Sequence, residues 1–202
     1  MRPLVRFEYG GSKRGTGNLL GGTLHLLFVC TGNICRSPMA ERLALVFAAE
    51  RGIRDLTAES AGTRAVISHP MHHEAANVLS ALGGQPADFS ARQLTPRLVA
   101  NSDLILTMMR AHRHSVLELV PRKLNRTFTL REASMLVTEL GAELVEDLAE
   151  LRSRLASDTD NGLDVRDPIG HTSDVFTAVG DEIADLLPPI IEVCGRSIDY
   201  RL

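Results

Sequence analysis

Residues 26–40 read LLFVCTGNICRSPMA, and this stretch decides the fold. The apolar run at residues 23–29 has no helical period, and the small polar residues at 31–33 end it, which is typical of a buried parallel strand that enters a loop. From Pro38, a residue that a first helical turn tolerates, apolar residues recur at helical spacing as far as about Gly52. The stretch therefore predicts a strand, a short polar loop and a helix in direct succession.

The rest of the chain continues this alternation of strands and helices. Strands are predicted at residues 55–60, 104–107 and 126–130, and helices at residues 70–82, 111–119, 131–156 and from about 174, the last one ending near Pro188 or resuming after the Pro188–Pro189 pair. Strands that alternate with helices imply right-handed crossovers and a parallel sheet. The predicted fold class is α/β, with four parallel strands in one domain.

The size and charge of the chain fit one globular domain. At 202 residues, roughly 70% of the surface of the unfolded chain can be buried, so no bound group is needed to hold the fold together. The net charge of -3 argues against broad electrostatic capture of nucleic acid, and no apolar run approaches the roughly 20 residues that span a bilayer. We expect a flexible N-terminal arm at residues 1–23 and one domain at residues 24–202.

The loop between the first strand and the first helix has the composition of an anion-binding site. Cys30 ends the strand, and Arg36 and Ser37 begin the helix. Ligands of such sheets bind at the carboxyl ends of the strands, and helix N-termini attract anions because their free N–H groups point outward. Gly32 and Asn33 tolerate the positive φ that a tight curl of backbone amides requires. A phosphoryl group would meet several N–H donors and a bidentate guanidinium there.

Cys30 and Cys35 could instead form a metal clip or a disulfide. A structural zinc site needs four ligands, and a C-x4-C pair supplies only two of them. An odd count of three cysteines suits a reducing compartment better than a secreted disulfide scaffold, so we expect a cytoplasmic protein. The histidines of the HPMHH segment at residues 69–73 are more typical of a solvated helix start than of a metal site. We therefore expect no metal and no cofactor.

The predicted anion-binding loop also favours a nucleophilic role for Cys30. A helix N-terminus and a neighbouring arginine favour the thiolate form of a cysteine, and the thiolate is the nucleophile. Ser37 can donate a hydrogen bond to that sulfur. Transfer of a phosphoryl group to sulfur leaves an alkoxide or a phenoxide behind, so the reaction needs a general acid.

Asp167 is the candidate for the general acid. It stands in the segment DPIG, where Pro168 stiffens the turn that would present the carboxyl group. Asp158, Asp160 and Asp164 compete with it on proximity alone.

The chain resembles the low-molecular-weight protein tyrosine phosphatases over about Leu24 to Leu187. The motif CTGNICRSPMAE at residues 30–41 is similar to the C-x5-R-S loop at the N-terminus of that family's domain. Further matching segments follow in the family's order: SAGT at residue 60, SARQL at 90, SDLILTM at 102, FTL at 128 and DPIG at 167. The resemblance implies a sheet flanked by helices on both faces, and metal-independent catalysis through a phosphocysteine.

Carried over by position, the resemblance assigns roles to individual residues. Cys30 would be the nucleophile, Arg36 the phosphate clamp and Asp167 the general acid. Ser37 would stabilise the thiolate, and Asn33 and Ser60 would brace the loop through hydrogen bonds. The phosphate-binding positions would be Thr31, Gly32, Asn33, Ile34, Cys35 and Ser37. Cys35 also matches a second loop cysteine that, in many members, traps the oxidised nucleophile as a reversible disulfide.

Ile34 bears on the choice of substrate. Isoleucine at this position is typical of the tyrosine branch, whereas the branch that removes phosphate from arginine typically has threonine there. We therefore expect a phosphorylated protein as the partner and phosphotyrosine-like groups as substrates, with protein arginine phosphatase activity as the alternative. Tyrosine-specific members usually carry aromatic walls where this chain has Ile169, Gly170 and residues 64–66.

Two further functions fit the same loop less well. A thioredoxin-coupled arsenate reductase needs a second redox pair, and this chain has no cysteine between Cys35 and Cys194, which we expect to be a packing residue. A non-enzymatic anion-sensing module is disfavoured because Cys30, Arg36 and Asp167 are all present.

Overall fold

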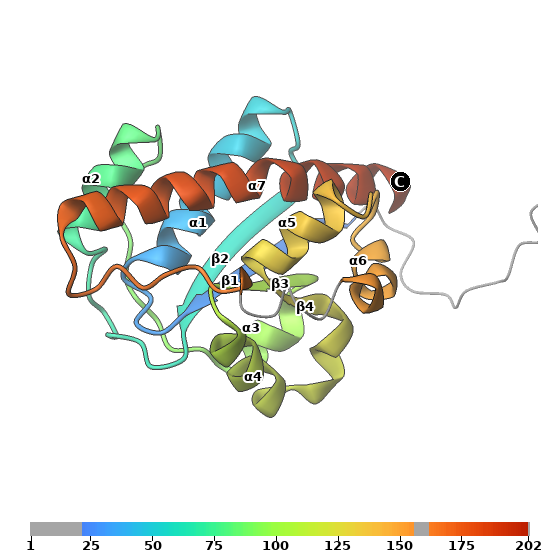
Figure 1. The fold of residues 1–202 in the computed structure, drawn as a ribbon, viewed down its shortest axis with the longest axis horizontal. Helices are drawn as coiled ribbons and strands as arrows, with labels where there is room; N and C mark the ends of the chain where they lie inside the picture. Colours follow the sequence, from blue (N-terminus) through green and yellow to red (C-terminus); the bar gives the residue numbers. More distant parts are fainter. Residues whose placement is uncertain (1–21, 156–161, 202) are drawn as a thin grey trace, which may run out of the picture.

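A computed structural model describes residues 22–155 and 162–201 of the chain (Figure 1). Almost all of the expected N-terminal arm, at residues 1–21, lies outside the described residues, as do Asp158 and Asp160. Within the described part, no helix combines the length and the apolar character needed to cross a membrane.

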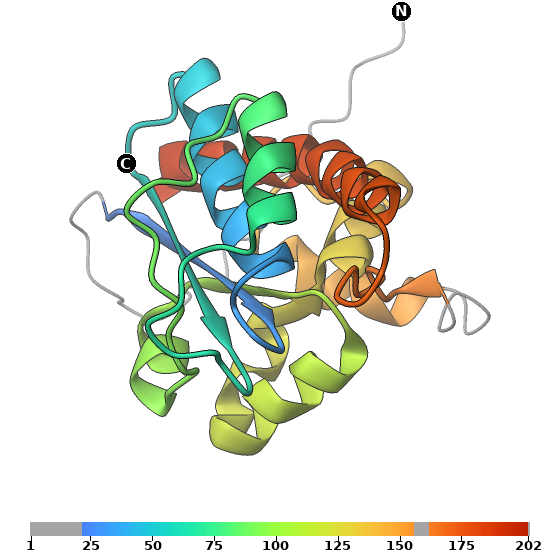
Figure 2. The ribbon, with the colours of Figure 1, turned by 90° about the vertical axis from the view of Figure 1, so that its left-hand side faces the viewer.

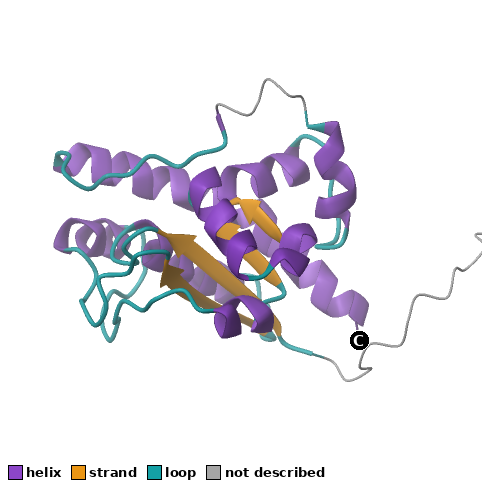
Figure 3. Cartoon of the chain, turned by 90° about the horizontal axis from the view of Figure 1, so that it is seen from below, coloured by secondary structure: helices purple, strands orange, loops and turns teal. Residues whose placement is uncertain are grey.

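The centre of the molecule is a parallel sheet of four strands, as predicted. The strands are β1 (Leu24–Cys30), β2 (Leu56–Gly62), β3 (Leu104–Thr107) and β4 (Thr127–Thr129), in the order β2-β1-β3-β4. In β1 every residue except His25 is buried, because this strand has a partner on each side and helices on both faces. Figure 3, seen from below, shows helices in front of the strands and behind them.

Helices cover both faces of the sheet, which confirms the predicted fold class. On one face lie α1 (Arg36–Glu50), α2 (His73–Ala81), α5 (Leu130–Thr138) and α7 (Ser173–Arg201), with α7 running the length of that face in Figures 1 and 2. On the other face lie α3 (Pro96–Asn101) and α4 (Arg110–Leu119). The side chains of β1 alternate between two cores: Phe28 packs with the first group of helices, and Leu27 and Val29 pack with the second.

The prediction of one helix over residues 131–156 is wrong. The segment contains α5, a break, and then α6 (Asp147–Leu151), which is followed by the 3-10 helix η2 (Arg152–Arg154). A second 3-10 helix, η1 (Pro121–Arg126), precedes β4. The break occurs at Gly141, which adopts a φ of 71°, and the Asp147 carboxylate then accepts hydrogen bonds from two backbone N–H groups of the intervening turn. Leucines and acidic residues therefore keep a helical spacing across this segment although the chain turns between α5 and α6.

The prediction that α7 would end or be interrupted near Pro188 is also wrong. The helix runs unbroken from Ser173 to Arg201 with Pro188 and Pro189 inside it. Two adjacent prolines remove two intrahelical donors, but buried residues before and after them, Leu187 and Ile190 among them, anchor both halves of the helix to the core. Packing of the apolar face therefore offsets the local cost.

Candidate active site

The loop from Thr31 to Cys35 lies between the carboxyl end of β1 and the first turn of α1. The sulfur of Cys30 lies 2.9 Å from Ser37 Oγ and 3.2 Å from the backbone nitrogen of Asn33, which donates to it. Cys30 is 3% exposed, so these contacts are shielded from solvent. Two donors from the loop and the first helical turn therefore point at one sulfur atom.

Asn33 holds the loop in its curl. It adopts a left-handed φ of 55°, and its side-chain nitrogen donates to Ser37 Oγ at 2.9 Å and to Ser60 Oγ at 2.8 Å. Its side-chain oxygen accepts from the backbone nitrogen of Arg92 at 2.9 Å, which fixes the orientation of the amide. All of these atoms are buried or half-buried, so the bonds are not exchanged for water.

The Asn33 amide determines the direction of the surrounding hydrogen bonds. Because both of its N–H groups are donated to hydroxyl oxygens, each serine must turn its own proton elsewhere. Ser60 donates to a Glu41 carboxylate oxygen at 2.6 Å, and Ser37 donates to the sulfur of Cys30. Burial raises the pKa of Glu41, and the Ser60 hydrogen bond opposes that rise. The network therefore delivers a donor to the cysteine, which stabilises negative charge on sulfur.

The buried side chain of Arg36 lines the cavity beside the loop. Its side chain is 2% exposed, and one terminal nitrogen donates to the carbonyl of Val165 at 3.0 Å while the other forms an ion pair with Asp167. Its Nε–H is buried and has no partner. A buried guanidinium with a free donor beside the cysteine is a preformed position for one oxygen of an anion.

Among the candidate acids, the structure places Asp167 at the site and Asp164 elsewhere. Asp167 bonds to Arg36 and accepts from the backbone nitrogen of Ile169 at 3.2 Å, and its side chain is 43% exposed. Asp164 accepts from the backbone nitrogen of Arg110 at 2.7 Å, at the start of α4. Of these two carboxylates, only that of Asp167 lines the same cavity as Cys30.

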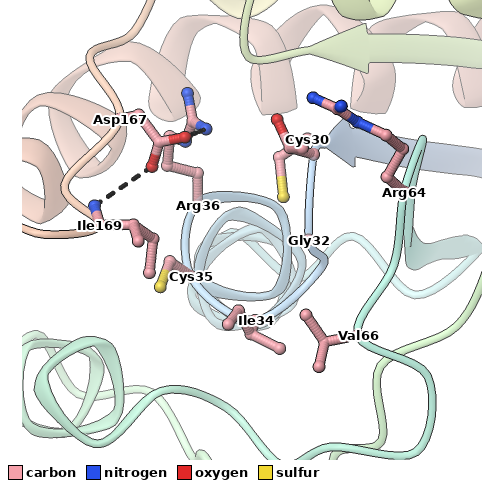
Figure 4. A pocket seen from close by; sticks show the side chains of 10 residues that line it. Cys30, Gly32, Ile34, Cys35, Arg36, Arg64, Val66, Asp167 and Ile169 are labelled. Atoms are coloured by element: carbon pink, nitrogen blue, oxygen red, sulfur yellow. Dashed lines mark hydrogen bonds and ion pairs between the residues drawn. The ribbon is translucent and has the colours of Figure 1, made fainter.

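A cavity of about 240 Å³ opens above these residues (Figure 4). Its lining residues are Cys30, Thr31, Gly32, Ile34, Cys35, Arg36, Arg64, Val66, Asp167 and Ile169. The structure thus brings every predicted phosphate-binding position to the cavity except Asn33 and Ser37, whose side chains are buried together with that of Ser60. Its walls, formed by Ile34, Val66 and Ile169, are aliphatic.

Cys35 also lines the cavity but differs from Cys30 in its surroundings. Burial and the neighbouring Cys30 raise the pKa of the Cys35 thiol to about 12. Cys30, Cys35 and Cys194 are free thiols in this structure, and Cys194 is fully buried in the core, as expected of a packing residue. Within the described ranges, no group of three or more histidine, cysteine or acidic side chains could hold a metal ion. With a pKa this high, the Cys35 thiol stays protonated near pH 7.

Sequence reasoning missed His112, which lies on α4 and reaches the site from behind. Its Nε2 lies 2.9 Å from the hydroxyl of Thr31, and its Nδ1 is buried without a partner. Burial, reinforced by the charge of Arg36, lowers the pKa of His112 to about 4, so the ring is neutral near pH 7. A single histidine in an amphipathic helix carries no sequence signal of this role. Glu41, on α1, was missed for the same reason.

Comparison with known proteins agrees with this geometry. The family profile described as "Low molecular weight phosphotyrosine protein phosphatase" matches residues 25–138. The low molecular weight protein-tyrosine-phosphatase Etp of Escherichia coli K12 is 35% identical over 102 residues, which cover 50% of this chain and 66% of Etp. The curated relatives of this kind are therefore matched over about two thirds of their length.

Two further matches span more of the chain. The protein-arginine-phosphatase of Bacillus subtilis is 28% identical over 166 residues, which cover 81% of this chain and 92% of that protein. The crystal structure of a low molecular weight protein tyrosine phosphatase from T. tengcongensis superposes with a TM-score of 0.67 and 30% identity, covering 84% of this chain and 98% of that one. Together with the loop geometry, these matches show that the chain belongs to the low molecular weight phosphotyrosine protein phosphatase family.

Proposed function

We propose that the protein is a phosphomonoesterase that hydrolyses phosphotyrosine-like groups on protein substrates through a phosphocysteine intermediate. The observation that carries this proposal is the convergence of three groups on one cavity: the Cys30 sulfur with its two donors, the buried Arg36 guanidinium and the Asp167 carboxyl group. The three groups come from two distant segments of the chain, which are joined by the contacts of Arg36 with Asp167 and Val165.

The first chemical step transfers the phosphoryl group to sulfur. The Cys30 thiolate attacks phosphorus, the bond from phosphorus to the ester oxygen breaks, and Asp167 in its acid form protonates the departing oxygen. The equatorial phosphoryl oxygens bind the loop amides and Arg36, whose Nε–H is free to receive one of them. The ion pair between Arg36 and Asp167 opens when the phosphate dianion replaces the carboxylate on the guanidinium.

The second step regenerates the enzyme. Asp167, now a carboxylate, takes a proton from water, and the resulting hydroxide attacks phosphorus. The bond between sulfur and phosphorus breaks, inorganic phosphate leaves, and the Cys30 thiolate is restored to the Ser37 hydrogen bond. The Arg36 charge and the loop N–H donors supply the electrostatic stabilisation in both steps, so the sequence of steps needs no metal.

Substitution of the two reacting groups tests this mechanism. Cys30→Ser is expected to abolish hydrolysis of an aryl phosphate in the presence of a chelator. Asp167→Ala is expected to slow esters with poor leaving groups far more than esters with good ones, because only the poor leaving groups need the proton. Equal slowing of both classes would remove Asp167 from the acid role, and activity surviving in Cys30→Ser would exclude the phosphocysteine.

Protein arginine phosphatase activity is the second candidate. The Bacillus subtilis relative of that name aligns over 81% of this chain, and the cavity walls are aliphatic, as suits a side chain without a ring. Against it, Arg64 brings a positive charge to the cavity, which repels the cationic guanidinium of a phosphoarginine. This repulsion and Ile34 both favour the phosphotyrosine-like substrate.

A side-by-side assay on a phosphotyrosine peptide, a phosphoarginine peptide and arsenate separates the candidates. We expect the highest kcat/KM on the phosphotyrosine peptide and no turnover of arsenate. Ile34→Thr should shift the ratio of the two peptide activities toward phosphoarginine, because it removes an aliphatic wall and adds a hydroxyl at the cavity. A wild-type preference for phosphoarginine would replace the first proposal with the second.

A further inference from the structure

We infer that the Arg64 guanidinium interacts with the residues that flank the phosphorylated residue of a substrate. The protein should therefore prefer substrates in which those flanking residues are acidic. This inference rests on the proposed function, since it concerns the surface around the same cavity. Arg64 is exposed, follows β2 in the loop SAGTRAV, and lines the cavity together with the Cys30 loop. In Figure 4 it rises beside Cys30, on the side of the cavity away from Asp167.

The backbone of Arg64 is held in a fixed position relative to the Cys30 loop. Thr63 donates from its backbone nitrogen to the carbonyl of Cys30 at 2.9 Å, and Arg64 donates to that of Thr31 at 2.9 Å. Val66 then donates to Gly32 at 3.0 Å. Residues 63–66 therefore run alongside the loop as a continuation of the pairing between β1 and β2. A side chain on this segment is presented to the same point of any substrate whose phosphate is bound by the loop.

The charge of Arg64 is not compensated by the part of the chain that the structure describes. The other cavity arginine, Arg36, is buried and paired with Asp167, whereas the side chain of Arg64 has no hydrogen bond and no ion pair with any described residue. An exposed guanidinium at the mouth of a cavity attracts carboxylates of an approaching peptide, and it repels a lysine or arginine in the same place.

Apolar side chains beside Arg64 complete a surface that fits a peptide. Val66 is 38% exposed, Ile67 is 62% exposed and Ile169 is 47% exposed, and these are three of the six large hydrophobic residues exposed in the described part of the chain. Val66 and Ile169 line the cavity, and Ile67 follows Val66 in the chain. A peptide whose phosphorylated side chain enters the cavity lays its neighbouring residues over this mouth. One carboxylate and one apolar side chain would both find complementary groups there.

Three phosphotyrosine peptides that differ only in the two flanking residues test the inference. With glutamate, glutamine or lysine on both sides of the phosphotyrosine, we expect wild-type kcat/KM to fall in that order. Each step should be about two- to fivefold, the range that an exposed ion pair supports. Raising the salt concentration should compress the differences.

Charge reversal at Arg64 gives the decisive comparison. The ratio of kcat/KM for the glutamate peptide to that for the lysine peptide should approach one in Arg64→Gln and fall below one in Arg64→Glu. The matched control is Arg97→Gln, an exposed arginine on α3, which should keep the wild-type ratio. The ratio divides out any general loss of activity, and thermal melting checks that each variant is folded.

Each result bears on one proposal or the other. A wild-type protein that hydrolyses all three peptides at equal rates overturns the inference and leaves the proposed function standing. So does a glutamate preference that survives unchanged in Arg64→Glu. A wild-type protein that hydrolyses none of the peptides and no small aryl phosphate overturns the proposed function itself.

Discussion

At the scale of single residues, Asn33 is the loop position whose side chain and backbone both hold the loop in its conformation. Its amide makes three hydrogen bonds, to Ser37, Ser60 and the Arg92 backbone, and its backbone adopts a conformation that few residues tolerate. It thereby links the curl of the loop to the direction of the donors on Cys30.

Removal of the Asn33 side chain should therefore cost stability as well as activity. Asn33→Gly keeps the positive φ but leaves buried hydroxyl and amide groups without partners, so the free energy of unfolding should fall by about 1–3 kcal/mol. Asn33→Ala should lose about 1 kcal/mol more, because alanine is strained at this φ. Urea denaturation measures both. Equal stability of the two variants would show that the backbone conformation relaxes when the amide is lost.

His112 gives the protein a pH-dependent stability. Its pKa is lowered in the folded state to about 4, from an ordinary value of 6.5, so the unfolded chain binds the proton more readily. The contribution is fully present above pH 6.5 and is lost as the pH falls toward 4, by up to about 3 kcal/mol. Urea denaturation of wild type and His112→Gln between pH 7 and pH 4 checks this. The variant should lose less stability over that interval, and parallel curves would contradict the prediction.

At the scale of elements, helices and strands could be predicted wherever one period of apolar residues dominates. The strands at residues 24–30 and 104–107 and the helix at residues 36–50 agree with the prediction within two residues at each end. The break near Gly141 was missed because leucines on both sides of it keep a helical spacing, although one set packs in α5 and the other in α6. The short α3 was missed because six residues carry too little pattern.

The continuous α7 illustrates the opposite error, in which a local rule was overridden by packing. If the prolines destabilise α7, Pro189→Ala should raise the free energy of unfolding by about 1–3 kcal/mol. The substitution restores a backbone N–H donor and removes the steric clash between the proline ring and the residue before it. Pro96→Ala is the control, since Pro96 stands in the first turn of α3, where a proline costs nothing. Denaturant titration of both variants measures the effect. No gain in Pro189→Ala would mean that the proline ring contributes as much by packing.

At the scale of the whole molecule, the candidate site joins parts of the chain that are more than 130 residues apart. Cys30 and Arg36 belong to the first strand and helix, while Asp167 precedes α7, and the Arg36 bond to the Val165 carbonyl connects the two regions. The loop residues could be predicted from their motif. The contacts of Glu41 and His112 could not, because they depend on which strand α1 packs against and on which loop residue α4 reaches.

An oxyanion that occupies the cavity should therefore stabilise the entire fold. Inorganic phosphate binds only the assembled site, so at 100 times its Kd it should add about 2.7 kcal/mol to the free energy of unfolding. Thermal melting with and without phosphate, at matched ionic strength in chloride, measures this gain. Arg36→Ala should abolish it. An equal gain in that variant would indicate that phosphate acts through solvent and not through the site.

The hydrogen bonds that fasten residues 63–66 to the Cys30 loop involve only backbone atoms. They persist whatever side chains stand at positions 64, 66 and 67, so these positions can vary while the Cys30 loop stays where it is. Gly62 is different, because a Cβ there would lie 2.5 Å from the carbonyl oxygen of Thr31 and force the two segments apart. Under the proposed function, side chains exchanged just after Gly62 would change which substrates fit the cavity without moving the Cys30 loop, whereas a side chain at Gly62 itself would move it.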